Sequence, residues 1–142
     1  MKLKKILPLL LLVISFTACV EKIVRIETKE HMVTIPPEFS VEKETLKGRL
    51  SAIIPAEEIN FNSSKTTSSG EEDYHTLNVE IISDSLPKNG IAFYKMTDEI
   101  QTAVESGISN YRDYQKLSIT VRQQILENGV EHNRSYKKEI EL

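Results

Sequence analysis

The spacing of the apolar residues changes twice in the second half of the chain, and this change constrains the fold more than any other feature. Across Tyr74–Ser83, apolar and polar residues alternate, which is the pattern of a half-buried strand. Across Ile91–Tyr111, apolar residues recur at steps of three and four, as in an amphipathic helix of about twenty residues. Alternation returns across Lys116–Gln124. The pattern predicts a strand–helix–strand unit whose two strands are parallel.

The dipeptide Asn128-Gly129 follows the last of these strands and favours a two-residue type I′ turn. If these residues form the turn, the residue numbers of each cross-strand pair sum to 257. Val121 then faces Tyr136, so apolar residues meet on one face of the hairpin. Ile119 faces Lys138, which is the one exception. A shift of one residue would move the apolar residues to opposite faces, so the predicted register is specific.

Two upstream segments are less clear. Leu46–Ile54 is mixed and partly apolar, and it stops at Pro55. Ser63–Gly70 is by composition either a disordered linker or a Thr-rich strand that runs into a Ser-Gly turn. Gly107 is unfavourable inside a helix by up to about 1 kcal/mol relative to Ala, and a close approach of helix to sheet would explain it.

If Ser63–Gly70 contributes a strand, the order of elements is strand, strand, helix, strand, strand. One amphipathic helix then covers one face of a mixed sheet of about four strands. The sequence therefore predicts an α+β fold, a two-layer sandwich. The opposite sheet face would present polar residues to solvent or to a partner.

The first eighteen residues have the composition of an export signal. A short cationic start, Met1–Lys5, precedes the apolar run Ile6–Phe16, and the small residues Thr17 and Ala18 follow. The apolar run is too short to cross a bilayer, which needs about 20 such residues. We therefore expect residues 1–18 to be a cleaved signal peptide rather than a transmembrane anchor.

Phe16-Thr17-Ala18-Cys19 resembles the lipobox of bacterial lipoproteins, although Phe16 stands where Leu is usual. The resemblance implies cleavage between Ala18 and Cys19 and attachment of fatty acids such as palmitate at Cys19, the only cysteine in the chain. Two or three acyl chains would hold the protein on a membrane, because each buried CH₂ contributes about 0.8 kcal/mol. We expect the outer membrane, facing the periplasm or the cell surface. The alternative is an ordinary secreted protein with an incidental cysteine.

The prolines at Pro36-Pro37 suggest how the exported part is organised, because they disfavour regular pairing. We expect residues 19–45 to form a lipid-anchored tether and residues 46–142 a single domain. The alternative is that one of the short apolar runs, Val20–Ile26 or Met32–Ile35, joins the sheet as an edge strand.

Residues 59–124 resemble a family of small uncharacterised lipoproteins from Bacteroidetes-type bacteria. The resemblance lies in the Ser/Thr-rich Asn62–Gly70, in Tyr74–Ile81, in Leu86-Pro87 before the helix, and in Tyr111–Tyr114 before Leu117–Val121. It favours a strand at Asn62–Gly70. It also implies the fold and the membrane address, and it implies no activity.

The charge balance argues against nucleic acid as a partner. Three of the 18 basic residues lie in the predicted signal, so 15 remain against 21 acidic residues, a net charge of −6. Phosphate binding needs clustered Lys and Arg. Lipid at Cys19 makes the membrane one partner, and an envelope protein or glycan is the expected second.

No residue pattern predicts catalysis, a metal or a cofactor. The three histidines, His31, His75 and His132, are not spaced as metal ligands. The carboxylate groups Glu57-Glu58, Glu71–Asp73 and Asp98-Glu99 are more often solvated than catalytic.

Tyr74, Tyr111 and Tyr114 are candidate partner-binding residues, since tyrosine often anchors interfaces; the alternative places Tyr111 at the rim of the core. We therefore expect a non-enzymatic binding or interaction module. The alternatives are an envelope hydrolase that uses surface carboxylates and a structural subunit of a surface assembly.

Overall fold

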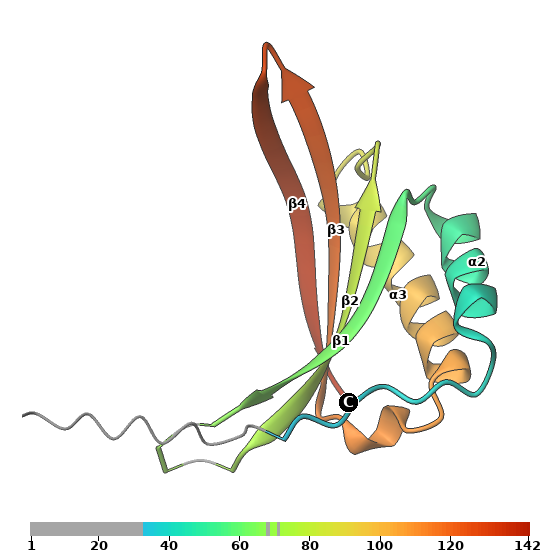
Figure 1. Cartoon of the computed structure of the whole chain (residues 1–142), viewed down its shortest axis with the longest axis vertical. Helices are drawn as coiled ribbons and strands as arrows, with labels where there is room; N and C mark the ends of the chain where they lie inside the picture. Colours follow the sequence, from blue (N-terminus) through green and yellow to red (C-terminus); the bar gives the residue numbers. More distant parts are fainter. Residues whose placement is uncertain (1–32, 68, 71) are drawn as a thin grey trace, which may run out of the picture. The chain divides into compact units, whose positions relative to one another are not determined.

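The computed structural model describes residues 33–67, 69–70 and 72–142, which contain a four-stranded sheet and two α-helices (Figure 1). The elements in chain order are α2 (Lys43–Ile53), β1 (Glu58–Thr66), β2 (Tyr74–Ser83), α3 (Gly90–Gly107), the short 3₁₀ helix η2 (Tyr111–Asp113), β3 (Lys116–Glu127) and β4 (Val130–Glu141). The predicted α+β class is confirmed.

The strands lie in the order β1-β2-β3-β4. β2 and β3 are parallel and are joined by α3, as the change of periodicity predicted, while β1 and β4 pair antiparallel to β2 and β3. The Ser/Thr-rich segment does form a strand, because β1 runs to Thr66 and a turn includes Ser69 and Gly70.

The predicted register of the last hairpin is confirmed. Val121 pairs with Tyr136, and Ile119 pairs with Lys138. Lys138 does not bury its charge on the apolar face, because its side chain extends along that face and its Nζ atom reaches polar atoms of α3. The Nζ atom lies 3.0 Å from Thr97 Oγ1 and 3.1 Å from Asp98 Oδ1.

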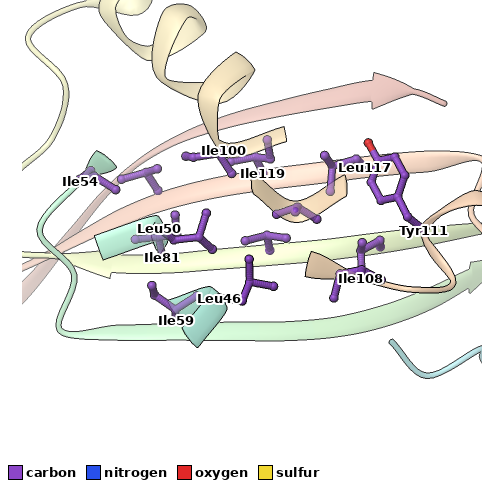
Figure 2. Packing of buried hydrophobic residues seen from close by; sticks show 14 of the residues in the cluster. Leu46, Leu50, Ile54, Ile59, Ile81, Ile100, Ile108, Tyr111, Leu117 and Ile119 are labelled. Carbon is purple, nitrogen blue, oxygen red and sulfur yellow. The ribbon is translucent and has the colours of Figure 1, made fainter. Parts of the chain in front are cut away.

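The core lies between one face of the sheet and the two helices (Figure 2). Its strand residues alternate along the chain, so they all point to the same side of the sheet. Each fully buried aliphatic side chain contributes about 1.5–3 kcal/mol. The buried apolar residues of the strands are Ile59, Leu77, Val79, Ile81, Leu117, Ile119 and Val121.

The expectation of a single helix was wrong. Leu46–Ile54, a mixed segment to which the sequence assigned neither helix nor strand, lies mostly within α2, which contributes Leu46 and Leu50 to the core. The sequence signal of this helix is weak, because only these two of its residues are buried and Gly48 interrupts it. Both helices cover the same sheet face (Figure 1).

Gly107 allows the two helices to come close together. A Cβ atom at this position would lie 2.7 Å from Leu46 Cδ1, which is too short for a real contact. The close approach is therefore to α2 and not to the sheet. α3 also ends here rather than at Tyr111, because Ile108 adopts extended backbone angles and forms an isolated bridge with Phe39.

Part of the segment expected as tether lies on the core. Ile35, Phe39 and Val41 pack against it, and the Ser40 amide donates to the Gly107 carbonyl at 3.0 Å. The folded part therefore begins before residue 46, because apolar residues on both sides of Pro36-Pro37 find places beside α3 and η2. Val33–Ile35 is not in a strand, and Val20–Ile26 lies outside the described residues.

The hairpin β3–β4 continues past the end of β2, whose last pair with β3 is Ser83 with Gln123 (Figure 1). Residues 124–133, here called the hairpin arm, form two strands without a further neighbour in the sheet. Near the tip of the arm, Leu126 and Val130 are 75% and 56% exposed.

Candidate functional site

The residues predicted to carry the lipid, Ala18 and Cys19, lie outside the described residues, as does His31. Lipidation therefore stays a prediction from the sequence. Within residues 33–67, 69–70 and 72–142, neither helix has the length and apolar character needed to span a bilayer.

Two of the three candidate tyrosines have buried side chains. Tyr111 and Tyr114 are 7% and 2% exposed, and burial raises the pKa of both hydroxyls. The Tyr114 hydroxyl donates a hydrogen bond of 2.9 Å to the Ile35 carbonyl, while Tyr111 accepts one of 3.4 Å from Gln101 Nε2. Tyr114 thus holds the N-terminal segment onto the core. Neither ring is free to insert into a partner.

Tyr111 and Tyr114 also line an open pocket of about 410 Å³ near the end of α3. Glu105, Glu141 and Arg112 line it as well. Its acidic and basic groups are mixed, so it has no strong preference for a ligand of either charge.

Tyr74 is separate from this pair. It begins β2 and is partly exposed, and Lys116 Nζ lies 4.4 Å from its ring centroid. Lys116 also forms an ion pair of 3.1 Å with Glu141, and the hydrogen bond to Glu141 raises the pKa of this lysine. The structure therefore does not bring the three tyrosines together, and only Tyr74 is accessible as an anchor.

Tyr74 lies at one end of the sheet surface that faces away from α2 and α3, here called the polar sheet face. Its charges neutralise one another: Arg122 binds Glu80 at 3.2 Å, and Lys137 binds Glu139 at 2.8 Å. The hydrogen bond from Lys137 lowers the pKa of Glu139. The polar sheet face is formed by Asn60, Asn62, Ser64, Tyr74, Thr76, Asn78, Glu80, Lys116, Ser118, Thr120, Arg122, Lys137, Glu139 and Glu141.

The carboxylates considered for hydrolysis lie apart from one another. Asp73 binds Lys65 at 2.7 Å beside the β1–β2 turn, and Asp98 on α3 binds Lys138. Glu58 is at the opposite end of β1. The eight residue steps from Glu58 to Thr66 span about 26 Å of strand, so Glu58 lies far from the turn. The described residues of these groups do not form one acid/base pair. Nor do the described residues contain a group of three or more side chains placed to bind a metal.

A second open pocket, of about 630 Å³, lies beside the start of α3. Loop residues Ser85–Lys88 form one side, and Gln123, Arg134, Ser135 and Tyr136 of the hairpin form the other. We call it the cationic pocket, because both of its charged lining residues, Lys88 and Arg134, are basic. Figure 1 shows why these elements meet: β2 ends, the loop turns, and α3 begins at the same end of the sheet past which the hairpin continues.

The charges of this pocket differ from those of the polar sheet face. Among the described residues, neither Lys88 nor Arg134 forms an ion pair with a carboxylate. The pocket also lies at the carboxyl end of the parallel pair β2–β3, where ligands of α/β units commonly bind.

Sequence analysis missed the cationic pocket, because Lys88 and Arg134 are far apart in the chain and belong to different elements. The one available signal was Lys88-Asn89-Gly90, the junction between a predicted strand and the following helix. Comparisons with family models, curated proteins and solved structures find no match for this chain.

Proposed function

We propose that this chain is a lipid-anchored, non-enzymatic binding module of the bacterial envelope. The export signal and the lipobox-like Phe16–Cys19 support the anchor. The cationic pocket is the observation that carries the binding function, since it places two cations that have no ion pair within the described part of the chain in a concave site of about 630 Å³. Ligand pockets in proteins usually have volumes of about 300–1,000 Å³.

The residues that line this pocket favour ligand binding over catalysis. Lys88, Arg134 and Gln123 are donors of hydrogen bonds, and no carboxylate, histidine or cysteine lines the pocket. Such a set can hold and orient a ligand. It offers no general base of ordinary pKa near neutrality.

One observation favours a second candidate, a structural subunit of a surface assembly. Leu126 and Val130 expose apolar side chains near the tip of the hairpin arm. Pairing through this tip would bury them. A discrete complex on native gels that disappears when this chain is absent would support the structural role over the free binding module.

The membrane anchor is tested by the substitution Cys19→Ser in the native host. We expect loss of fatty-acid labelling and release from the membrane fraction, because no other thiol can accept the lipid. Ser15→Ala, which lies in the same signal but outside the modified position, serves as the control. A Cys19→Ser protein that is still labelled and still sediments with membranes contradicts the anchor.

The binding function is tested by photo-crosslinking in membranes of the native host, followed by mass spectrometry. One crosslinking amino acid replaces Ser85 in the cationic pocket, and another replaces Ser64 on the polar sheet face. We expect an enriched adduct, protein or glycan, at position 85. If neither position yields an enriched adduct, the chain is not a binding module.

A further inference from the structure

We propose that the cationic pocket binds an oxyanion, a phosphate or carboxylate group carried by a polar envelope molecule. This inference rests on the proposed function and names the class of its ligand. It rests on three observations: two basic side chains without an ion pair among residues 33–67, 69–70 and 72–142, a nearby helix end of the same sign, and neutral donors beside them.

Lys88 and Arg134 provide the first observation. They come from opposite sides of the pocket, and neither has an ion pair among the described residues. Two cations that line one concavity repel each other, and because both side chains are exposed, solvent and salt screen this repulsion in part. An oxyanion between them would replace this repulsion with two charge-assisted contacts. Arg134 could form a bidentate contact with a phosphate or carboxylate.

The start of α3 provides the second observation. The amino end of an α-helix carries a partial positive charge, which acidic residues in the first turn usually offset. The first turn of α3, beginning at Gly90, has no acidic residue, although the helix is 18 residues long. Lys88 lies two residues before that turn and adds charge of the same sign. Asn89 Oδ1 already accepts a hydrogen bond from the Ala92 amide and no residue of α3 lines the pocket, so the helix end contributes its partial charge beside the pocket rather than a contact to the oxyanion.

The neutral lining residues indicate what the oxyanion is attached to. Ser85 supplies a hydroxyl group, and Gln123 is already held in place by its hydrogen bond to the Asp84 carbonyl. Ser135, in contrast, pairs with Arg122 and directs its side chain to the polar sheet face. The Tyr136 ring is stacked on Phe93 at 5.1 Å between centroids, so it is also fixed. A hydroxyl beside a fixed aromatic ring suits a small polyhydroxylated group such as a sugar.

Two other pockets of the described domain do not have this character. The pocket near Tyr111 combines Arg112 with Glu105 and Glu141. The pocket between α2 and β1, of about 360 Å³, is lined by Glu44, Glu57 and Glu58 with Lys47. Of these three pockets, the cationic pocket alone has basic residues without acidic ones, although the exported chain has a net charge of −6 by sequence, with 21 acidic residues.

The test measures binding to the purified chain in a non-ionic detergent by calorimetry. The probes are inorganic phosphate, glucose 6-phosphate, glucuronate and neutral glucose, together with vesicles of phosphatidylglycerol or of phosphatidylcholine. We expect at least one anionic probe to bind more tightly than its neutral counterpart, and its affinity to fall as salt is added. Preference for the sugar probes or for phosphatidylglycerol identifies the source of the oxyanion.

Variants locate the site. Arg134→Gln and Lys88→Gln should each weaken binding of the preferred anionic probe about tenfold to a hundredfold, the range of one lost charge-assisted contact. Arg134→Lys should have a smaller effect, because it keeps the charge and loses the bidentate geometry. Lys95→Gln is the matched control: it removes the same charge from α3 at a position outside the pocket.

The inference is overturned if no anionic probe binds better than its neutral counterpart, or if Lys95→Gln weakens binding as much as Arg134→Gln. It is also overturned if the adduct formed at position 85 persists unchanged in Arg134→Gln membranes. In that last case the protein still has a partner, so the binding function stands while the oxyanion assignment fails.

Discussion

The polar sheet face and the cationic pocket both contain charged residues, and they differ in whether those residues form ion pairs. On the polar sheet face, Arg122 is paired with Glu80 and Lys137 with Glu139. In the cationic pocket, Lys88 and Arg134 have no such partner among the described residues. The charges of the polar sheet face are therefore balanced within the protein, whereas those of the cationic pocket would be balanced by a bound anion.

This difference teaches where to look for function on a surface with many charges. A pair such as Lys116–Glu141 contributes modestly to stability, and a partner would have to break it before using either group. Unpaired cations in a concave site present no such barrier. The density of charge is therefore a poor guide to a binding site, and the balance of charge is a better one.

Both surfaces depend on one core, and the largest expected effect tests this dependence. Leu46→Ala should lower the free energy of unfolding by about 2–5 kcal/mol, because Leu46 is fully buried and packs against Gly107. Leu126→Ala is the control, since Leu126 is exposed, and its effect should stay below about 0.5 kcal/mol. Urea denaturation measures both. Equal effects would mean that α2 does not support the sheet.

The comparison itself is tested by removing one cation from each surface. Arg122→Gln should destabilise the fold by about 1 kcal/mol, because Arg122 is two-thirds buried and its partner Glu80 would lose a charged contact. Arg134→Gln should change stability by less than about 0.5 kcal/mol, because no pair is lost. A double-mutant cycle with Glu80→Gln isolates the Arg122–Glu80 term. If Arg134→Gln were the more destabilising change, the distinction between the two surfaces would be wrong.

Lowering the pH should weaken the ion pairs of the polar sheet face, and its effect on stability should be smaller than those of the substitutions above. The pKa of Glu139 is lowered in the folded state, so its contribution to stability is present above its ordinary value of 4.5 and is lost as the pH falls through the lowered value. Lys137→Gln should remove most of this dependence, because Lys137 is the largest cause of the lowered pKa and Lys116 adds a smaller contribution. Carboxyl titration by NMR in both proteins checks the sign, and a Glu139 that titrates unchanged in Lys137→Gln refutes the cause.

Much of the fold could be predicted from local patterns, and the exceptions have physical reasons. The alternation in β2 and β3 and the turn at Asn128-Gly129 predicted strand directions and the hairpin register, because each depends only on neighbours in the chain or across one turn. α2 was missed because its helical pattern rests on Leu46 and Leu50 alone. Its position depends on contacts with Gly107, which no local pattern contains.

The candidate sites also divide into those that a contiguous motif predicts and those that depend on tertiary packing. The lipobox-like Phe16–Cys19 is a contiguous motif, so the sequence alone predicts the anchor, which lies outside the described residues. The tyrosines illustrate the opposite case, because residue type suggested that Tyr111 and Tyr114 were interface anchors, while their burial assigns them to the core. Burial depends on what packs on a residue from elsewhere in the chain.

What the sequence by itself determined about this protein is the α+β class, the parallel crossover and the hairpin register, since these follow from periodicity and one turn. Only the tertiary structure decided that α2 joins α3 on one sheet face, and that Lys88 and Arg134 line the same pocket. The physical reason is distance along the chain. The loop before α3 and the hairpin β3–β4 meet only after the parallel strands have paired, and their meeting brings the two unpaired charges together.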